Sequence, residues 1–377
     1  LGIKAARAAI ADAGVNAADI DFTVAGSMAQ ASYDAYMTPR HIGLYAGVPY
    51  DRPAHLVQRI CGTGIEVILQ AADHISLGRG DLALCVGTES MSRNPIAAYT
   101  HRSGFRMGQV EFKDFLWEAL LDPAVSCTMG DTAENLAKKY NITREEVDRF
   151  AERSFARAVS AQQNGFLGGE IVAVTNETFE MENGNPRTIK LPRKVEAVDA
   201  DSHIRPSPYE ILSKLRPAFG GVQTGGNSSA VVDGAAGVVL GSSEYAKRNG
   251  LTPHARIIAG AAVGVPPEIM GIGPVPAIQA VLDQTGLTVD QIDRIEINEA
   301  FGAQILACIR ELGLDEDKVN VNGGAIAIGH PLGATGVRIT NTLARELTKS
   351  GGRYGIASAC IGGGQGIAVL IENSELA

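Results

Sequence analysis

The feature that most restricts the fold of this chain is an internal duplication. Residues 5–21 (AARAAIADAGVNAADID) are similar to residues 277–293 (AIQAVLDQTGLTVDQID), at an offset of 272 residues. The same offset aligns residues 64–87 with residues 336–359, and in both copies an apolar helical period leads through a small turn into a short apolar run. Two copies of a helix that leads into a buried strand indicate two similar α/β halves.

The first half carries a large insertion that the second half lacks. The last strand candidates of the two halves, GAAGVVLGSSE and GQGIAVLIENSE, are offset by only 130 residues instead of 272. The first half therefore contains 272 − 130 = 142 additional residues. They lie roughly between Met91 and Gly225, in a more polar segment where residues 135–154 have the pattern of a helix. The second half also has a strand candidate at 255–264 without a counterpart in the first half, and we infer that an N-terminal strand is absent.

We therefore predict two halves and an inserted loop domain within the 377 residues. Residues 1–92 and 218–246 form the first half, residues 93–217 the inserted domain, and residues 247–377 the second half. The 45% of apolar residues and 20% of charged residues are typical of a globular protein and exclude a disordered one. The net charge of −9 argues against a partner that is a nucleic acid, and no apolar run is long enough for a membrane span.

The cysteines favour a reducing compartment. There are five of them, widely spaced and without a Cys-x-x-Cys pair, which argues against a disulfide framework and against a structural zinc site. We expect the cytoplasm, and an organellar matrix stays open as the alternative. Cys85, Cys127 and Cys308 have no flanking chemistry, so we interpret them as packing residues.

Cys61 is the first candidate for chemistry, because it lies just ahead of a predicted helix in the segment QRICGTGIEVILQAADHI. The positive end of a helix dipole and the free backbone N–H groups there lower the pKa of a thiol and favour the thiolate. The small residues that follow Cys61 allow a substrate to approach the backbone closely. A buried apolar cysteine is the structural alternative for this segment taken alone.

Two further segments of the second half carry reactive side chains. His330 lies in the glycine-rich segment NVNGGAIAIGHPLGATG, which can hold one imidazole rigidly as a base for a thiol. Cys360 lies at the end of a predicted buried strand, and the GGGQG run after it offers backbone N–H groups to a developing oxyanion. A structural turn with an incidental histidine, and a core cysteine before a tight turn, are the alternatives.

Polar side chains near a third predicted strand complete the candidates. Asn298 is able to orient a water or donate to an oxyanion, and Glu299 is able to cap the helix that follows it. Asn227, in GGNSS, matches a glycosylation acceptor, a match that we interpret as accidental in a protein of a reducing compartment.

Together these segments resemble the thiolase family over essentially the whole chain. Residues 298–301 (NEAF), the run 320–336 that contains GHP, and residues 360–366 (CIGGGQG) are similar to the three C-terminal motifs of that family, in the expected order. The segment around Cys61 resembles the nucleophile motif of the family. The connecting segments SMS, MGDTAEN and KLRPAF are also similar to those of thiolases.

The resemblance implies a five-layer α/β/α/β/α fold and a ping-pong acyltransferase of fatty acid metabolism. It implies that Cys61 takes the acyl group, that His330 accepts the Cys61 proton, and that Cys360 removes the α-proton of the second acyl-CoA in condensation or protonates the leaving carbanion in thiolysis. It also implies two oxyanion holes: His330 with a water held by Asn298, and the backbone N–H groups of Cys61 and Gly362. Such a reaction requires a nucleophile, a second base and stabilisation of two oxyanions.

The resemblance also implies where coenzyme A binds. It places CoA contacts at Arg205 and Ser229, and the acyl and pantetheine region at four apolar side chains: Met129, Phe219, Met270 and Phe301. CoA and acyl-CoA are expected as substrates, with no permanently bound cofactor and no metal. The family further implies a homodimer or a homotetramer, since closed symmetry is the usual state of such enzymes.

Two positions depart from the pattern of the family. Many members have Asn three residues before the nucleophile, where this chain has Gln58. Members that form acetoacetyl-CoA often have His just before the Met-Gly pair, where this chain has Thr128. The second departure favours longer 3-ketoacyl chains over strict acetoacetyl-CoA specificity.

Two alternative functions stay open at this point. A condensing enzyme that acts on carrier-protein-bound chains usually has two His, or His and Asn, in place of the second cysteine, so Cys360 argues against it. A catalytically silent protein of the same fold, which binds a lipid or a partner, is the alternative from another class. The presence of Cys61, His330 and Cys360 together argues against this alternative.

Overall fold

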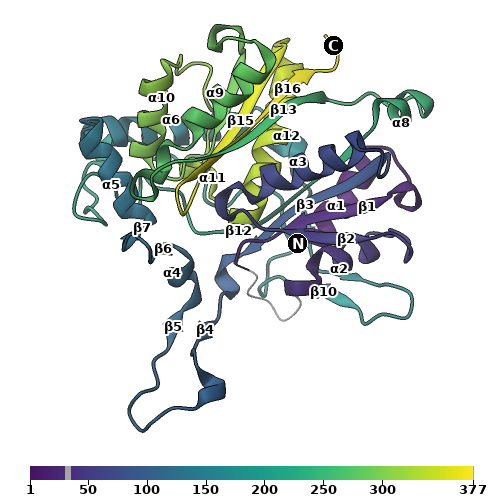
Figure 1. The fold of residues 1–377 in the computed structure, drawn as a ribbon, viewed down its shortest axis with the longest axis horizontal. Coiled ribbons are helices and arrows are strands. Elements are labelled where there is room, and N and C mark those ends of the chain that lie inside the picture. The colour runs from purple at the N-terminus through teal and green to yellow at the C-terminus, as the bar shows by residue number, and fades with distance from the viewer. Residues whose placement is uncertain (30–34, 377) are drawn as a thin grey trace.

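The computed structural model of the chain describes residues 1–29 and 35–376 (Figure 1). The helices are α1 (Gly2–Asp12), α2 (Thr38–Tyr45), α3 (Thr63–Ser76), α4 (Phe115–Ala119), α5 (Met129–Lys139), α6 (Arg144–Gln163), α7 (Tyr209–Leu212), α8 (Ser243–Arg248), α9 (Pro274–Thr285), α10 (Gly302–Leu312), α11 (Ala325–Ile328) and α12 (Leu332–Ser350). The strands of the two main sheets are β1 (Phe22–Gly26), β2 (Ala54–Val57), β3 (Leu82–Ser90), β12 (Asp233–Gly241), β13 (Ala255–Gly264), β14 (Arg294–Ile297), β15 (Tyr354–Ile361) and β16 (Gln365–Asn373). Short strand pairs are made by β4 (Ile96–Ala97), β5 (Lys113–Asp114), β6 (Leu121–Asp122), β7 (Cys127–Thr128), β8 (Val174–Thr175), β9 (Glu177–Phe179), β10 (Arg187–Ile189) and β11 (Ala197–Val198).

The two main sheets repeat the same arrangement, which confirms the duplication. The first has the order β12-β3-β1-β2 and the second the order β13-β16-β15-β14. In both, a parallel pair (β1 with β3, β14 with β15) is followed by an antiparallel partner (β12 or β16). In the second sheet β13 lies outside β16, whereas in the described part of the first sheet no strand lies outside β12. The strand candidate at 255–264 is β13 itself.

Helices cover both faces of both sheets, so the molecule has the expected five layers (Figure 1). The outer helices α1 and α2 pack on the first sheet, α9 packs on the outer face of the second, and α3 and α12 lie between the two sheets. Strands covered on both sides cannot alternate apolar and polar residues, which is why β1, β3 and β15 are almost continuously apolar and buried. The predicted α/β/α/β/α fold is confirmed.

The two central helices cross at the two glycines that the duplication relates. A Cβ atom placed on Gly64 would lie 2.5 Å from the backbone nitrogen of Val337, and one on Gly336 would lie 2.2 Å from that of Ile65. Only glycine permits two helix backbones to approach this closely. Gly64 belongs to the first turn of α3 and Gly336 to the second turn of α12, so the crossing brings the starts of both helices together.

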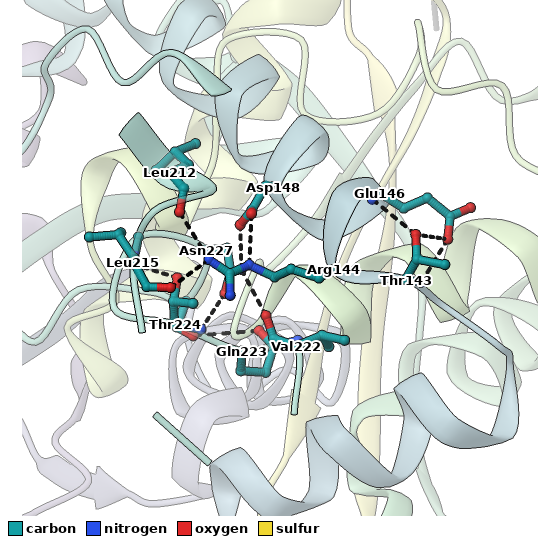
Figure 2. Close-up of polar contacts among 12 residues, drawn as sticks. Thr143, Arg144, Glu146, Asp148, Leu212, Leu215, Val222, Gln223, Thr224 and Asn227 are labelled. Carbon is teal, nitrogen blue, oxygen red and sulfur yellow. Dashed lines mark hydrogen bonds and ion pairs between the residues drawn. The ribbon is translucent and has the colours of Figure 1, made fainter. Parts of the chain in front are cut away.

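The inserted segment contributes two helices where one was predicted. The helical pattern of residues 135–154 is interrupted, because α5 ends at Lys139 and α6 begins at Arg144. Thr143 starts the second helix with a capping box: its Oγ1 accepts from the Glu146 N–H, and the Glu146 carboxylate accepts from the Thr143 N–H at 2.7 Å (Figure 2). Both helices pack against α10 of the second half.

A buried polar network fixes the loop that returns from the insertion (Figure 2). Asp148 on α6 accepts from Arg144 Nε at 2.7 Å and from Asn227 Nδ2 at 2.8 Å. The side-chain oxygen of Asn227 also accepts from the Thr224 N–H at 2.7 Å. The main-chain carbonyl of Asn227 accepts from the N–H of Gly302 at 2.9 Å. The Asn227 side chain is fully buried, so the predicted absence of glycosylation there agrees with its burial. The loop is thereby held at the start of α10.

Residues 93–120, which contain β4, β5 and α4, form an arm that extends away from the two sheets (Figure 1). Its surface is unusually apolar, with five large side chains more than half exposed: Ile96, Tyr99, Met107, Phe112 and Trp117. At its base, Leu116 and Ala119 pack against the apolar cluster that contains Cys61. Along residues 1–29 and 35–376, no helix has both the length and the apolar character to cross a membrane.

Candidate active site

Cys61 lies in a 3-10 turn (Ile60–Gly62) that runs directly into α3, as the sequence predicts. The turn is held by Thr63, whose Oγ1 donates to the carbonyl of Ile60 at 2.6 Å and accepts from the N–H of Arg59 at 2.9 Å. Ile60 has a φ of +47°, a conformation that costs energy for a β-branched residue. Cys61 is only 5% exposed and packs in a buried apolar cluster with Met28, Met91 and Leu332.

The expected low pKa of the Cys61 thiol is wrong for this structure. Burial raises its pKa to about 11, and the nearby Glu89 carboxylate adds to the rise. Hydrogen bonds to the sulfur from the backbone N–H groups of Gly362 and of Cys61 itself act in the opposite direction. Desolvation of the charged form outweighs the helix start. The thiol therefore needs a base that removes its proton when it reacts.

Cys360 lies one residue before the end of β15 and is completely buried. Burial raises its pKa well above the usual value for a thiol, and Cys61 raises it further. The segments of the two cysteines are in contact: a Cβ atom placed on Gly62 would lie 2.6 Å from the side chain of Ile361, and one on Gly362 would lie 3.6 Å from that of Ile60. The Gly362 N–H that reaches the Cys61 sulfur comes from the turn between β15 and β16. The second half thus delivers a thiol and a backbone donor to the cysteine of the first half.

His330 is buried, and both of its ring nitrogens have partners. Nδ1 lies 2.6 Å from Thr335 Oγ1, and Nε2 lies 3.3 Å from Asn298 Nδ2. An amide nitrogen only donates, so we assign the ring proton to Nδ1 and leave Nε2 as the acceptor. Burial lowers the pKa of His330 to about 3, with a smaller contribution from the positive charge of Arg338. The imidazole is therefore neutral near pH 7 and able to take a proton.

Asn298 follows β14 directly, and its N–H donates to the carbonyl of Ser358 on β15 at 2.9 Å. Its buried Oδ1 has no hydrogen-bond partner among the described residues. Buried acceptors are rarely left unpaired in proteins, so this oxygen is suited to hold a water. The structure thus joins Asn298 and His330, which the sequence places 32 residues apart.

Glu299 is structural, as one interpretation of the sequence held, but it does not cap the helix that follows it. Its carboxylate accepts from Ser154 Oγ at 2.7 Å, from Asn320 Nδ2 at 2.9 Å and from the N–H of Ile326 at 3.1 Å. Ile326 belongs to α11, so the capped helix is the one that leads to His330 and not α10. A carboxylate that is buried reaches whichever donors the fold brings to it.

Most of the predicted substrate-lining residues gather beside Cys360. Met129, Met270 and Cys360 form one buried apolar cluster, and Phe301 packs against it. The ring of Phe219 meets that of Phe301 edge-on, with 6.2 Å between their centroids. These contacts make an apolar wall at the second cysteine.

The two predicted CoA contacts are less closely connected to this wall. The Ser229 N–H donates to the carbonyl of Ala300 at 3.0 Å, which places it beside the Asn298 segment. Arg205 is exposed, and its guanidinium contacts His203 and the ring of Phe155. Within the part of the chain that the structure describes, it contacts no other predicted site residue, and its role in CoA binding stays a prediction.

The remaining cysteines lie outside the reacting groups. Cys85 and Cys308 are fully buried, and Cys127 is half-buried in the short strand β7. The Cys308 thiol donates to the carbonyl of Gly271 at 3.3 Å, which agrees with a packing role.

Sequence reasoning missed two polar residues at the site, Thr335 and Glu89. Thr335 lies five residues after His330 on the first turn of α12, and that spacing was the available signal. Glu89 directly precedes the SMS segment, and no local pattern shows which donors it meets.

Comparison with known proteins agrees with this geometry. Residues 1–244 match the family model described as "Thiolase, N-terminal domain", and residues 251–373 match "Thiolase, C-terminal domain". The chain is 42% identical to the human protein named "3-ketoacyl-CoA thiolase, mitochondrial" over 98% of this chain and 91% of the relative. It is 41% identical to "Beta-ketothiolase BktB" of Cupriavidus necator, over 99% of this chain and 92% of the relative.

Solved structures show the same similarity in three dimensions. The crystal structure of human mitochondrial 3-ketoacyl-CoA thiolase in complex with CoA superposes with a TM-score of 0.92 at 41% identity, over 98% of this chain and 91% of that one. The crystal structure of the Bacillus anthracis acetyl-CoA acetyltransferase also gives a TM-score of 0.92, at 41% identity and over 99% and 92% of the two chains. With both family models matched and relatives similar along nearly their whole length, the chain belongs to the thiolase family.

Proposed function

We propose that this chain is an active thiolase, which transfers acyl groups between CoA thioesters by thiolysis of 3-ketoacyl-CoA or by the reverse Claisen condensation. The observation that carries the proposal is the contact between the segments of two buried cysteines from different halves: Gly62 lies against Ile361, and Gly362, whose N–H donates to the Cys61 sulfur, lies against Ile60. A protein that only bound a lipid or a partner would have no need of two buried thiols and a neutral imidazole there. No comparison supports such a silent protein.

In the first step we assign nucleophilic attack to Cys61. Its sulfur attacks the carbonyl carbon of a thioester, its proton passes to His330 Nε2, and the departing group takes up a proton as the acyl–sulfur bond forms. In thiolysis the departing group is the acetyl-CoA carbanion, which Cys360 protonates. The charge that develops on the carbonyl oxygen is stabilised by the backbone N–H groups of Cys61 and Gly362.

In the second step of thiolysis the CoA thiol gives its proton to the Cys360 thiolate and its sulfur takes the acyl group, while the departing Cys61 sulfur recovers its proton from His330. In condensation the first acetyl-CoA acylates Cys61, His330 Nε2 keeps the Cys61 proton, and Cys360 gives its own proton to the departing CoA thiolate. The Cys360 thiolate then removes the α-proton of the second acetyl-CoA, and the enolate oxygen is stabilised by the protonated His330 Nε2 and by a water on Asn298 Oδ1. The enolate carbon bonds to the acyl carbon, the acyl–sulfur bond to Cys61 breaks, and the Cys61 sulfur recovers its proton from His330. The unpaired Oδ1 supports the water, because a buried acceptor needs a donor. The relative solved with CoA bound supports CoA as the substrate, and Arg205 and Ser229 remain the proposed contacts.

For the acyl chain we propose a preference for 3-ketoacyl groups longer than acetoacetyl. The Thr128 hydroxyl is engaged in the capping box of α5, where it accepts from the Asp131 N–H and donates to the Asp131 carboxylate at 2.7 Å. No imidazole therefore projects from this position toward the wall formed by Met129 and Phe301. A series of kcat/KM values over 3-ketoacyl-CoA chain lengths tests the preference, and a maximum at acetoacetyl-CoA contradicts it.

We propose that the active form is a homodimer or homotetramer, in which the apolar arm is covered by another copy of the chain. The exposed apolar side chains of residues 93–120 support this, since patches of this kind mark interfaces. Light scattering at micromolar concentration is the test, with Phe112→Glu as the variant that weakens the contact. A stable monomer of the parent protein contradicts the proposal. We propose the cytoplasm as the compartment, because the five free cysteines favour a reducing one.

A thiolysis assay tests the activity itself. Free CoA and acetoacetyl-CoA should give two molecules of acetyl-CoA. The reaction is monitored by the loss of the enolate absorbance of acetoacetyl-CoA. The Cys61→Ser variant serves as the matched control, since it keeps the size of the side chain and loses the thiol. Absence of turnover by the folded parent with every 3-ketoacyl-CoA tested would refute the proposal.

A further inference from the structure

Glu89 is a buried carboxylate beside the site that the proposed mechanism does not use. It lies near the end of β3 and is 3% exposed. Among residues 1–29 and 35–376, four donors reach its carboxylate, three backbone N–H groups and one hydroxyl, and none of the four is a lysine or an arginine. A charge without a cationic partner is expensive to bury, so its place in the fold needs a reason.

The four hydrogen bonds connect the two halves of the molecule. Three donors come from the loop after β1: Ser27 Oγ at 3.2 Å, the Met28 N–H at 2.8 Å and the Ala29 N–H at 3.2 Å. The fourth is the N–H of Gly333 at 2.9 Å, in the first turn of α12. One carboxylate thus holds a loop of the first half against a helix of the second half.

The helix α12 depends on this contact at its start. Its N-cap residue is Pro331, which has no side-chain acceptor for the free N–H groups there. Glu89 supplies both the acceptor and the negative charge that a helix start favours, and it does so from the other half of the chain. His330 directly precedes Pro331, so a displacement of this helix start moves the imidazole.

The segments that Glu89 joins also pack against Cys61. Cys61 packs in one apolar cluster with Met28, Ala29 and Leu332, the residues on both sides of the carboxylate. We propose that Glu89 is a positioning residue of the thiolase reaction, which fixes His330 relative to Cys61 by joining their supporting segments. The inference rests on the proposed function, because it assigns Glu89 a role in that reaction.

The charge of Glu89 supports position rather than activation as its role. Burial raises the pKa of the Cys61 thiol, and the negative charge of Glu89 on β3 raises it further, whereas the backbone N–H groups of Gly362 and of Cys61 itself lower it. A negative charge beside a nucleophilic thiol opposes formation of the thiolate. Removal of the charge alone should therefore make Cys61 easier to ionise, even while catalysis becomes worse.

The test compares Glu89→Gln and Glu89→Asp with Glu372→Gln. Gln keeps the shape of Glu89 but turns an NH2 group toward a backbone N–H, so we expect kcat for thiolysis to fall by about 10–100-fold with KM nearly unchanged. The rate at which iodoacetamide alkylates Cys61 is measured against pH by peptide mapping. In Glu89→Gln this rate should begin to rise at a lower pH than in the parent. Asp keeps the negative charge, but its shorter side chain cannot reach the same donors. In Glu89→Asp kcat should therefore fall, while the pH profile of Cys61 alkylation should match that of the parent.

Glu372 is the matched control. It is equally buried but is paired with Arg256 and Arg353 at the opposite end of β15 from Cys360. Glu372→Gln should lower thermal stability and leave kcat and the alkylation profile unchanged. The inference is overturned if folded Glu89→Gln keeps the kcat of the parent, or loses kcat without a shift of the alkylation profile. The alkylation readout needs no turnover, so failure of the proposed function, an inactive parent, is distinguished from failure of this inference.

Discussion

The two halves of the molecule have the same elements but different side chains at matching positions. The offset of 272 relates Cys61, at the start of α3, to Gly333 at the start of α12, and it relates Gln58 to His330. The proposed nucleophile occurs in one copy and the proposed base in the other. Because α3 and α12 cross at Gly64 and Gly336, the two helix starts lie together in the central layer. The duplicated fold therefore brings the two helix starts together, and the different side chains in the two copies provide the proposed chemistry.

The strongest way to test this division is to remove each cysteine separately. Cys61→Ala should accept no acyl group from acyl-CoA and should not condense acetyl units, because the nucleophile is lost. Cys360→Ala should still gain one acyl mass on Cys61 and should lose condensation by about 10²–10⁴-fold, as expected for a positioned acid or base. Mass spectrometry of the acylated peptide and a condensation assay measure the two activities.

Deuterium exchange into the methyl group of acetyl-CoA isolates the step assigned to Cys360, since exchange requires removal of the α-proton. Folded Cys360→Ala that exchanges deuterium as fast as the parent would show that another base acts. His330 would then be the next candidate. An acyl group mapped to Cys360 instead of Cys61 would reverse the assignment of the two halves.

A second prediction concerns the contact between the halves. Gly336→Ala places a methyl group against the backbone of α3, so we expect a loss of about 1–3 kcal/mol in the free energy of unfolding, with a lower kcat because both helix starts shift. Gly168→Ala is the control, since an added Cβ there meets nothing within 4 Å. Urea unfolding measures both variants. Equal stability of the two would mean that the glycine crossing is not a close contact in solution.

A further prediction concerns the acid titration of His330. The folded-state pKa is lowered to about 3, whereas the unfolded value is 6.5, so between these values only the unfolded chain binds the proton. Stability from this residue is therefore complete above pH 6.5 and is lost as the pH falls toward 3, at up to about 1.4 kcal/mol per pH unit. His330→Asn should flatten the dependence of unfolding free energy on pH between 4.5 and 6.5.

His101→Asn, which replaces an exposed histidine on the arm, is the matched control and should leave the pH dependence of the parent unchanged. Urea unfolding at several pH values gives the slopes. If His330→Asn has the same slope as the parent, the imidazole is not held neutral by burial, and its role as a base at neutral pH loses its support.

Local patterns in the sequence predicted those parts of the site that depend on neighbouring residues. The duplication predicted two similar α/β halves, and the resemblance to thiolases implied the five layers. The helix start after Cys61 follows from the small residues and the apolar period there. The order of the motifs around Asn298, His330 and Cys360 indicated the reaction class. The single helix predicted at 135–154 failed because the capping box at Thr143 was overlooked, although it is visible in the sequence.

The tertiary structure decided what depends on burial and on distant partners. A helix start lowers the pKa of a thiol, but the pKa of Cys61 rises because the packed fold excludes water from it. The pairing of His330 with Asn298, and the cap that Glu89 provides for α12, join residues 32 and 244 positions apart. Periodicity and turn chemistry act over a few residues and are therefore readable along the chain. Desolvation and the choice of hydrogen-bond partner arise only when distant segments pack together, so the three-dimensional fold alone determines them.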